Sequence, residues 1–233
     1  MKYPPVLGER ETLNLALSGR IRGFARYGDG DFTVMRGQGE LYQRWEPGLA
    51  AALAECLADP AYGVLNCIPR PVSEAESQFY YRWQAFIEAN AGLLPLLGTR
   101  AYGSAYISRM DSVPELHTPL YWTTVARLWV GRRVTLVRGS DRSLTAAKLM
   151  DSPSPPAGVD EVLTSFRNSW SDVEQIYARI VAIPNTVVLL CTGLAARPLV
   201  HRLVKDAKLC AYDLGHIGLY FECGKPRPIA DCR

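Results

Sequence analysis

The sequence predicts a single α/β domain, in which an open, mostly parallel β-sheet carries helices on both faces. The chain has 233 residues, of which 48% are hydrophobic and 21% charged. This length suits one ordinary domain with a full core, and the composition is typical of a globular protein rather than a disordered or coiled-coil one. Helix-like and strand-like stretches alternate along the chain, and this order builds a parallel sheet. We expect the domain to span residues 1–233.

Hydrophobic spacing and breaker residues define the elements of the first half. Leu13, Ala16 and Leu17 recur on one face of a helix, whereas short apolar runs bounded by proline or glycine are typical of buried strands. In chain order, the pattern predicts a helix at 9–18, a strand at 23–26, a tight glycine-bearing loop at 28–31, a helix at 49–57, a strand at 63–68, a helix at 79–87 and a strand end at 105–108.

The second half shows the clearest pattern. It predicts a helix at 120–129, a strand at 134–137, a helix at 173–180, a strand at 186–191, a helix at 195–206 and a strand at 209–212. The proline- and serine-rich stretch near 151–158 is expected to be an exposed loop. The final strand, helix and strand form a βαβ unit, and such units bind ligands at the carboxyl ends of their strands.

Positive charge is concentrated in one segment. The formal net charge of +3, with a pI near 8.5, is too small to indicate a nucleic-acid-binding protein. Residues 125–148, however, contain six lysines and arginines against one aspartate, a local charge of +5. We expect this cluster to face an acidic turn across the sheet edge, an arrangement that suits an anionic ligand bound through a metal.

The sequence predicts a cytoplasmic protein. No apolar run approaches the roughly 18 residues of a membrane-spanning helix, and the start of the chain at 1–5 lacks the apolar core of a signal peptide. The six cysteines show neither a CxxC pattern nor the spacing of a metal site. We therefore expect buried free thiols in a reducing compartment.

Polar residues follow the predicted strands. Asp29 and Asp31 flank a glycine directly after the first strand, and two carboxylates so placed can hold a divalent cation against a diphosphate. The alternative is an ordinary turn with solvated acids. Arg26 and Arg109 also stand at strand ends, where each can bind phosphate oxygens or pair with a surface carboxylate.

The last predicted strand leads into a second polar segment. Asp213 ends that strand, His216 follows three residues later and Glu222 six residues after it. An imidazole and carboxylates at the functional edge of a sheet can serve in acid–base chemistry, although a structural histidine is equally compatible with this pattern. His117 and His201 are interpreted as structural.

The turn at Thr192 and Gly193 precedes a helix, so its backbone N–H groups can receive a phosphate or a ribose. The sequence has neither a GxGxxG fingerprint nor a Walker lysine. A dehydrogenase or methyltransferase is therefore disfavoured.

Four of these motifs, in this order, resemble one known family. The segments at 26–32, 106–109 and 213–217, together with the Gly193 turn, are similar to the bacterial glycosyltransferases of the GT-D fold, formerly a domain of unknown function. The resemblance spans nearly the whole chain. It implies a Rossmann-like sheet that binds a nucleotide-diphosphate sugar, such as a UDP-sugar, with Mn²⁺ or Mg²⁺, and transfers the sugar to an acceptor hydroxyl.

The resemblance also implies roles for individual residues. The metal would be held by Asp29 and Asp31, where Asp31 replaces a family glutamate. The base that deprotonates the acceptor would be Glu222 or His216, with Asp213 beside them in the catalytic group. The donor would be bound by Arg26, Gly28, Ser108, Arg109, Arg142 and Gly193.

Departures from the family concern the acceptor. Gly218 stands where the family has a second aspartate, and two acids are replaced within the basic segment. The acceptor is expected to be a glycan or glycoprotein, or a hydroxymethylated base in phage DNA if the chain is a divergent phage-type member. The alternative function is a catalytically inactive nucleotide-binding or interaction module on the same fold.

Overall fold

A parallel sheet organises the protein, as seen in the computed structural model, which describes residues 3–71, 83–109, 112–139, 144–184, 187–222 and 225–227. Within these residues seven strands pair in the order β3-β2-β1-β7-β6-β4-β5, and every pairing is parallel. Their bounds are β1 Gly23–Arg26, β2 Val64–Ile68, β3 Gly103–Ser104, β4 Arg133–Arg138, β5 Gly158–Leu163, β6 Val187–Cys191 and β7 Cys210–Asp213. A separate antiparallel pair follows, with β8 at Phe221–Glu222 and β9 at Lys225–Pro226. The predicted open α/β sheet is confirmed.

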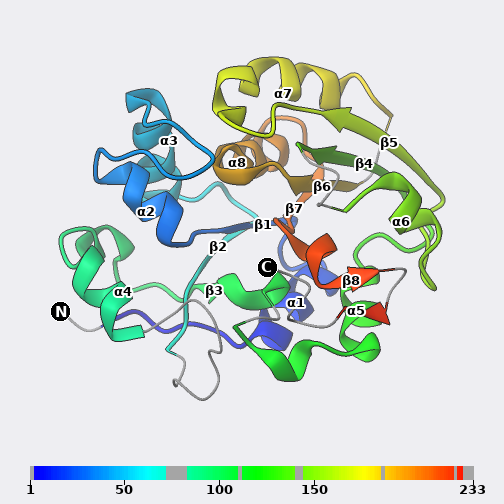
Figure 1. Cartoon of the computed structure of the whole chain (residues 1–233), viewed down its shortest axis with the longest axis horizontal. Helices are drawn as coiled ribbons and strands as arrows, with labels where there is room; N and C mark the ends of the chain where they lie inside the picture. Colours follow the sequence, from blue (N-terminus) through cyan, green and yellow to red (C-terminus); the bar gives the residue numbers. More distant parts are fainter. Residues whose placement is uncertain are drawn as a thin grey trace.

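Helices lie on both sides of the sheet. Figure 1 shows α3, α7 and α8 above the strands and α1 and α5 below them. The α-helices are α1 Glu9–Leu17, α2 Asp29–Met35, α3 Pro47–Ala58, α4 Trp83–Asn90, α5 Pro119–Ala126, α6 Ala146–Met150, α7 Val173–Val181 and α8 Ala196–Lys205. Short 3-10 helices are η1 Leu94–Leu97, η2 Ala105–Ser108, η3 Pro114–Leu116, η4 Ser169–Asp172, η5 Gly193–Ala195 and η6 Ile217–Leu219. None of these helices is long and apolar enough to cross a membrane.

The centre of the core lies where α8 packs on β1. All five residues of β6 are buried, as expected for a strand covered on both faces. On α8, Val200 and Val204 face β1 at Gly23, where an added Cβ would lie 2.8 Å from Val204 Cγ2 and 2.7 Å from the Ala211 carbonyl oxygen. Only glycine allows this close approach. The contact fixes the first turn of α8 near the carboxyl end of β1, where the polar residues gather.

Two predictions near the site are wrong. The segment Ala105–Ser108 is not a strand end but the 3-10 helix η2, because the Ser104 hydroxyl accepts a hydrogen bond from Tyr106 N and ends β3 after two residues. The segment 28–31 is not the tight loop that was predicted, since α2 begins at Asp29 and the Asp31 carboxylate accepts a hydrogen bond from Gly28 N.

Strand β5 was missed because its sequence is polar. Asp160 and Glu161 interrupt its apolar residues, and β5 is an edge strand that pairs with β4. The proline- and serine-rich stretch before it is a loop, as predicted, but it is not exposed throughout, since Ser152 and Pro156 are buried. It is held to the core, since Trp129 Nε1 donates to the Ser154 carbonyl oxygen over 3.2 Å and Gly131 N to that of Pro155. The part of the predicted 79–87 helix before Trp83 lies outside the described residues.

The buried free thiols are confirmed in part, and His201 is structural as predicted. Cys67 and Cys191 are buried free thiols, whereas Cys56 and Cys210 are free but only partly buried; Cys223 and Cys232 lie outside the described residues. His201 is buried on α8. Its Nδ1 accepts a hydrogen bond from Ala61 N, so its proton lies on Nε2, which donates to Asn66 Oδ1 over 2.9 Å.

This environment predicts a pH dependence of stability. Burial, with a smaller contribution from the nearby Arg100, lowers the pKa of His201 to about 4, whereas an unfolded histidine titrates near 6.5. As pH falls from 6.5 toward 4, the unfolded chain gains a proton that the folded chain does not, so stability falls by on the order of 3 kcal/mol.

The test compares the free energy of unfolding of the wild type and His201→Asn in urea at pH 6.5 and pH 4.5. We expect the wild type to lose about 2–3 kcal/mol more than the variant over this interval. Equal losses in the two proteins would show that His201 does not titrate with folding.

Candidate active site

A pocket of about 230 Å³ opens at the carboxyl edge of the sheet. Its lining comes from the segments that follow β1, β7, β6, β4 and β5, with further residues from η2 and from the loop between α2 and α3. Seven of the predicted site residues line it: Arg26, Gly28, Asp29, Asp31, Arg109, Gly193 and His216. The sheet edge therefore brings together most of the groups that the sequence selected.

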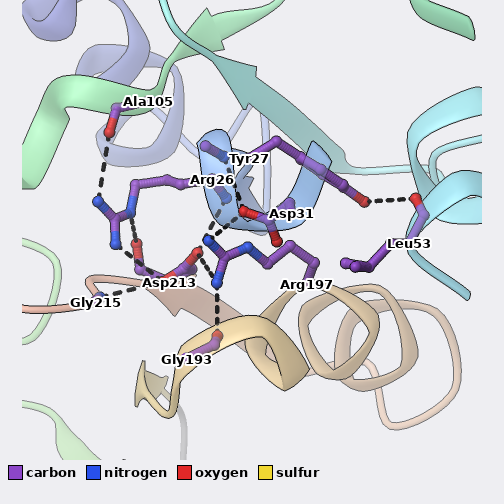
Figure 2. Close-up of polar contacts among 10 residues, drawn as sticks. Arg26, Tyr27, Asp31, Leu53, Ala105, Gly193, Arg197, Asp213 and Gly215 are labelled. Atoms are coloured by element: carbon purple, nitrogen blue, oxygen red, sulfur yellow. Dashed lines mark hydrogen bonds and ion pairs between the residues drawn. The ribbon is translucent and has the colours of Figure 1, made fainter. Parts of the chain in front are cut away.

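Arg26 and Asp213 form a buried ion pair beneath the pocket (Figure 2). Arg26 Nε donates to the Asp213 carbonyl oxygen over 2.7 Å, and its Nη2 lies 3.2 Å from Asp213 Oδ1. The same carboxylate accepts Arg26 N and Gly215 N, each over 3.1 Å. Gly215 has a φ of +51°, and a Cβ there would lie 1.9 Å from Arg26 Nη2. Residue 215 must therefore be glycine, because a side chain there would displace the Arg26 guanidinium.

A second buried ion pair joins Asp31 to Arg197 (Figure 2). Arg197 Nη2 donates to Asp31 Oδ2 over 2.8 Å, and Nη1 donates to the Gly193 carbonyl oxygen over 2.6 Å and lies 3.7 Å from Asp213 Oδ2. The four charged groups Arg26, Asp213, Arg197 and Asp31 thus form one network, which we call the charged floor. It carries two positive and two negative charges.

Arg197 is a site residue that the sequence analysis missed. It lies in the first turn of α8, where the helix dipole disfavours positive charge. An arginine at such a position needs an anion nearby. Its place at the start of a predicted helix is therefore the signal in the sequence that points to Arg197. Asp31 and Asp213 supply the negative charge here.

Asp31 has the electrostatics of a ligand-binding carboxylate. Burial raises its pKa to about 6, even though Arg197 and the hydrogen bond from Gly28 favour the ionised form. Its Oδ1 is buried and has no hydrogen-bond partner within the part of the chain that the structure describes. Such an oxygen is suited to a cation, since a buried anionic group is stable only when paired.

The carboxylates in the pocket fit a cation whose remaining coordination positions a substrate would fill. Asp29 lines the pocket beside Asp31, and Glu40 also lines it, with a pKa raised by burial and by the charge of Asp29. No group of three ligands that could hold a metal occurs among the residues described. Magnesium-type ions are commonly held by one or two carboxylates together with substrate phosphates, and Asp29 and Asp31 match that pattern.

His216 lines the pocket as an uncharged imidazole. Burial lowers its pKa to about 4, and the positive charges of Arg109 and Arg26 act in the same direction. Because the neutral ring predominates at pH 7, it can accept a proton or a hydrogen bond. Among the nearby charges, Arg109 has the largest effect on the pKa of His216.

The other predicted residues do not line the pocket. Asp213 is fully buried below it, and Ser108 is buried within η2. Glu222 is exposed on β8 and is not among the lining residues. Arg142 lies outside the described residues.

The basic segment is more dispersed than the sequence predicted. Arg133 stands at the amino end of β4, opposite the pocket, and pairs with Asp160 over 3.0 Å. Arg138, at the carboxyl end, pairs with Glu161 over 2.7 Å. Of the segment's described residues, Gly139 lines the pocket. Because β5 was not predicted, its two acids were not expected opposite these arginines.

Comparison with known proteins gives the family. The sequence model described as Glycosyltransferase GT-D fold matches residues 24–226. The chain is 28% identical to the probable glycosyl transferase Gly of Streptococcus gordonii, covering 84% of this chain and 30% of that relative. It therefore spans less than a third of the length of this curated relative.

Solved structures share the fold. A glycosyltransferase from Streptococcus sanguinis, described as DUF1792, aligns with a TM-score of 0.76 at 24% identity, covering 92% of this chain and 82% of that one. A domain of unknown function 1792, described as having a distinct glycosyltransferase fold, aligns with a TM-score of 0.76 at 22% identity, over 93% and 79% of the two chains. With the family match extending over most of its length, the chain belongs to the Glycosyltransferase GT-D fold family.

Proposed function

We propose that this chain is a glycosyltransferase that moves a sugar from a nucleotide-diphosphate sugar to an acceptor hydroxyl. The observation that carries the proposal is Asp31 Oδ1, a buried oxygen of the charged floor without a hydrogen-bond partner among the described residues, in a pocket at the carboxyl edge of a parallel sheet. Family membership supports the reaction class.

We also propose that residues 1–233 form one domain. We propose a cytoplasmic location, which the free thiols of Cys67 and Cys191 support.

We propose that Asp29 and Asp31 hold Mn²⁺ or Mg²⁺ together with the donor diphosphate. Such an ion, when bound, neutralises charge on the leaving diphosphate. Arg26 and Arg109 line the same pocket and supply further positive charge, which stabilises the leaving group electrostatically. Gly193, with a φ of +67°, and Gly28 let the donor approach the backbone closely.

The transfer requires one proton acceptor. The acceptor oxygen forms a bond to the anomeric carbon of the sugar, the bond from that carbon to the diphosphate oxygen breaks, and the hydroxyl proton moves to a protein base. Of the two bases selected from the sequence, His216 lines the pocket, which supports it as the proton acceptor. Glu222, on β8, remains the second candidate. The role of Asp213 is then to hold Arg26 and Arg197 in place rather than to touch the substrate.

For the acceptor, we propose a hydroxyl of a glycan or glycoprotein. A DNA acceptor depended on the basic segment, and two of its arginines are paired with Asp160 and Glu161. A gel-shift titration with duplex DNA at two salt concentrations separates the two acceptors. No affinity at low salt removes the DNA acceptor, whereas salt-dependent binding favours it.

The proposed function is tested by incubating the protein with a panel of nucleotide sugars and Mn²⁺ and measuring slow hydrolysis of the donor. We expect one donor to release nucleoside diphosphate in a Mn²⁺-dependent manner. Nucleotide binding without turnover, for every donor and acceptor tried, would instead favour an inactive binding module. No binding of any donor would contradict the proposal.

A further inference from the structure

Two half-exposed aromatic side chains stand at the mouth of the pocket. Tyr42 is 39% exposed and Phe166 49% exposed, and both line the pocket. Their rings meet edge to face, with centroids 5.2 Å apart and an angle of 60° between planes. Large exposed aromatic side chains at the rim of a polar pocket are characteristic of ligand-binding surfaces.

Hydrogen bonds made by the backbone and the side chain of Asn168 hold the two loops of this pair together. Asn168 N donates to the Tyr42 carbonyl oxygen over 2.8 Å, and Arg44 N donates to Asn168 Oδ1 over 2.7 Å. Asn168 has a φ of +57°, a left-handed conformation that asparagine tolerates better than most residues. The loop after α2 is thereby tied to the loop after β5, so the two rings form a pre-organised platform.

The platform lies at one end of the pocket. Phe166 follows β5, the last strand at one edge of the sheet, whereas Arg109 follows η2 beside β3 at the opposite edge. The charged floor lies between them, since its members come from the segments of β1 and β7 and from the first turn of α8 after β6. Along the sheet edge the pocket therefore runs from the aromatic pair, past the charged floor and His216, which follows β7, to Arg109 beside β3.

We propose that Tyr42 and Phe166 stack against the nucleobase of the donor. This inference rests on the proposed function. In a nucleotide-diphosphate sugar, the diphosphate separates the flat nucleobase from the sugar, so these two parts extend in opposite directions from a diphosphate bound at the charged floor. The sugar must lie beside the proposed proton acceptor, His216, which follows β7 and is separated from the β5 edge by β6 and β4. The nucleobase then lies at the other side, against Tyr42 and Phe166.

The opposite orientation makes a different prediction. A pyranose ring also packs against aromatic side chains, so an acceptor sugar is the competing occupant of the platform. In that case Phe166 would affect the acceptor and not the nucleotide. The two orientations are thus separated by which ligand loses affinity when the ring is removed.

The experiment measures binding of UDP and of inorganic pyrophosphate, each with Mn²⁺, to the wild type, Phe166→Ala and Tyr62→Ala. Tyr62 is fully exposed and does not line the pocket, so it is the matched control for loss of a surface ring. We expect Phe166→Ala to weaken UDP binding about 10- to 100-fold, as for other base-stacking aromatic side chains, and to leave pyrophosphate within twofold. Phe166→Trp should restore UDP binding, and Tyr62→Ala should change neither ligand.

Two results would overturn the inference. If wild type and Phe166→Ala bind UDP equally, the base lies elsewhere while the proposed function stands. The same holds if Phe166→Ala raises the KM for the acceptor with UDP affinity unchanged. If the wild type binds neither UDP nor any other nucleoside diphosphate, the proposed function fails together with the inference. Thermal unfolding of each variant confirms that the fold is retained.

Discussion

Replacing Asp213 by alanine is expected to destabilise the folded protein by about 3–5 kcal/mol, the cost of leaving buried charges without their partner. The carboxylate is fully buried and accepts hydrogen bonds from Arg26 and from Gly215 N, and it lies 3.7 Å from Arg197 Nη1. Alanine would leave Arg26, whose side chain is 9% exposed, without a counter-ion. Removal of the carboxylate would also remove the hydrogen bond from Gly215 N that holds the turn after β7.

The measurement is the free energy of unfolding in urea at pH 7, with Asp160→Ala as the matched control. Asp160 also pairs with an arginine, but its side chain is 32% exposed and that of Arg133 58% exposed. Such an exposed pair contributes about 0–1 kcal/mol. If Asp213→Ala costs no more than Asp160→Ala, Asp213 does not hold the charged floor together.

Replacing Asp31 by asparagine is expected to lower donor turnover by about 10²–10³, the scale seen when one group that stabilises transition-state charge is removed. Asparagine keeps the shape of the side chain but removes the charge that pairs with Arg197 and that we assign to the cation. The effect should appear in kcat and in the affinity for Mn²⁺ together. Donor hydrolysis at saturating donor, across a range of Mn²⁺ concentrations, measures both.

The matched control for Asp31→Asn is Asp151→Asn, at an exposed aspartate that ends α6 and does not line the pocket. This control should retain wild-type turnover. Thermal unfolding separates a loss of activity from a loss of structure. Full activity in a folded Asp31→Asn variant would mean that Asp31 has only a structural part, as the partner of Arg197.

The parts of the fold that sequence predicts well are those with strong local signals. The apolar run of β6 and the periodic face of α8 led to the βαβ unit, and the strand at 23–26 was predicted with the observed bounds. Strand β5 was not predicted, because Asp160 and Glu161 are unfavourable in a strand pattern. Their partners, Arg133 and Arg138, lie opposite them only in the folded sheet.

The candidate site also contains residues that the sequence predicts and residues that it does not. Asp29, Asp31 and His216 follow strands, and the edge of a parallel sheet necessarily collects such residues. Arg197 depends on the packing of α8 against β1, and the contact of Tyr42 with Phe166 depends on two loops far apart in the sequence. The position of Arg197 at the start of a helix indicates that an anion is near, but which carboxylates pair with it, and which rings meet, depends on tertiary structure.

We propose above all that the pocket binds a nucleotide-diphosphate sugar through Asp29 and the charged floor. A crystal structure of the protein soaked with a nucleotide sugar and Mn²⁺ is the decisive measurement. We expect the diphosphate and the ion between Asp29, Asp31 and Arg26, within hydrogen-bond or coordination distance. A nucleotide bound outside this pocket, or in it with the diphosphate away from both aspartates, would show that the proposed donor site is wrong.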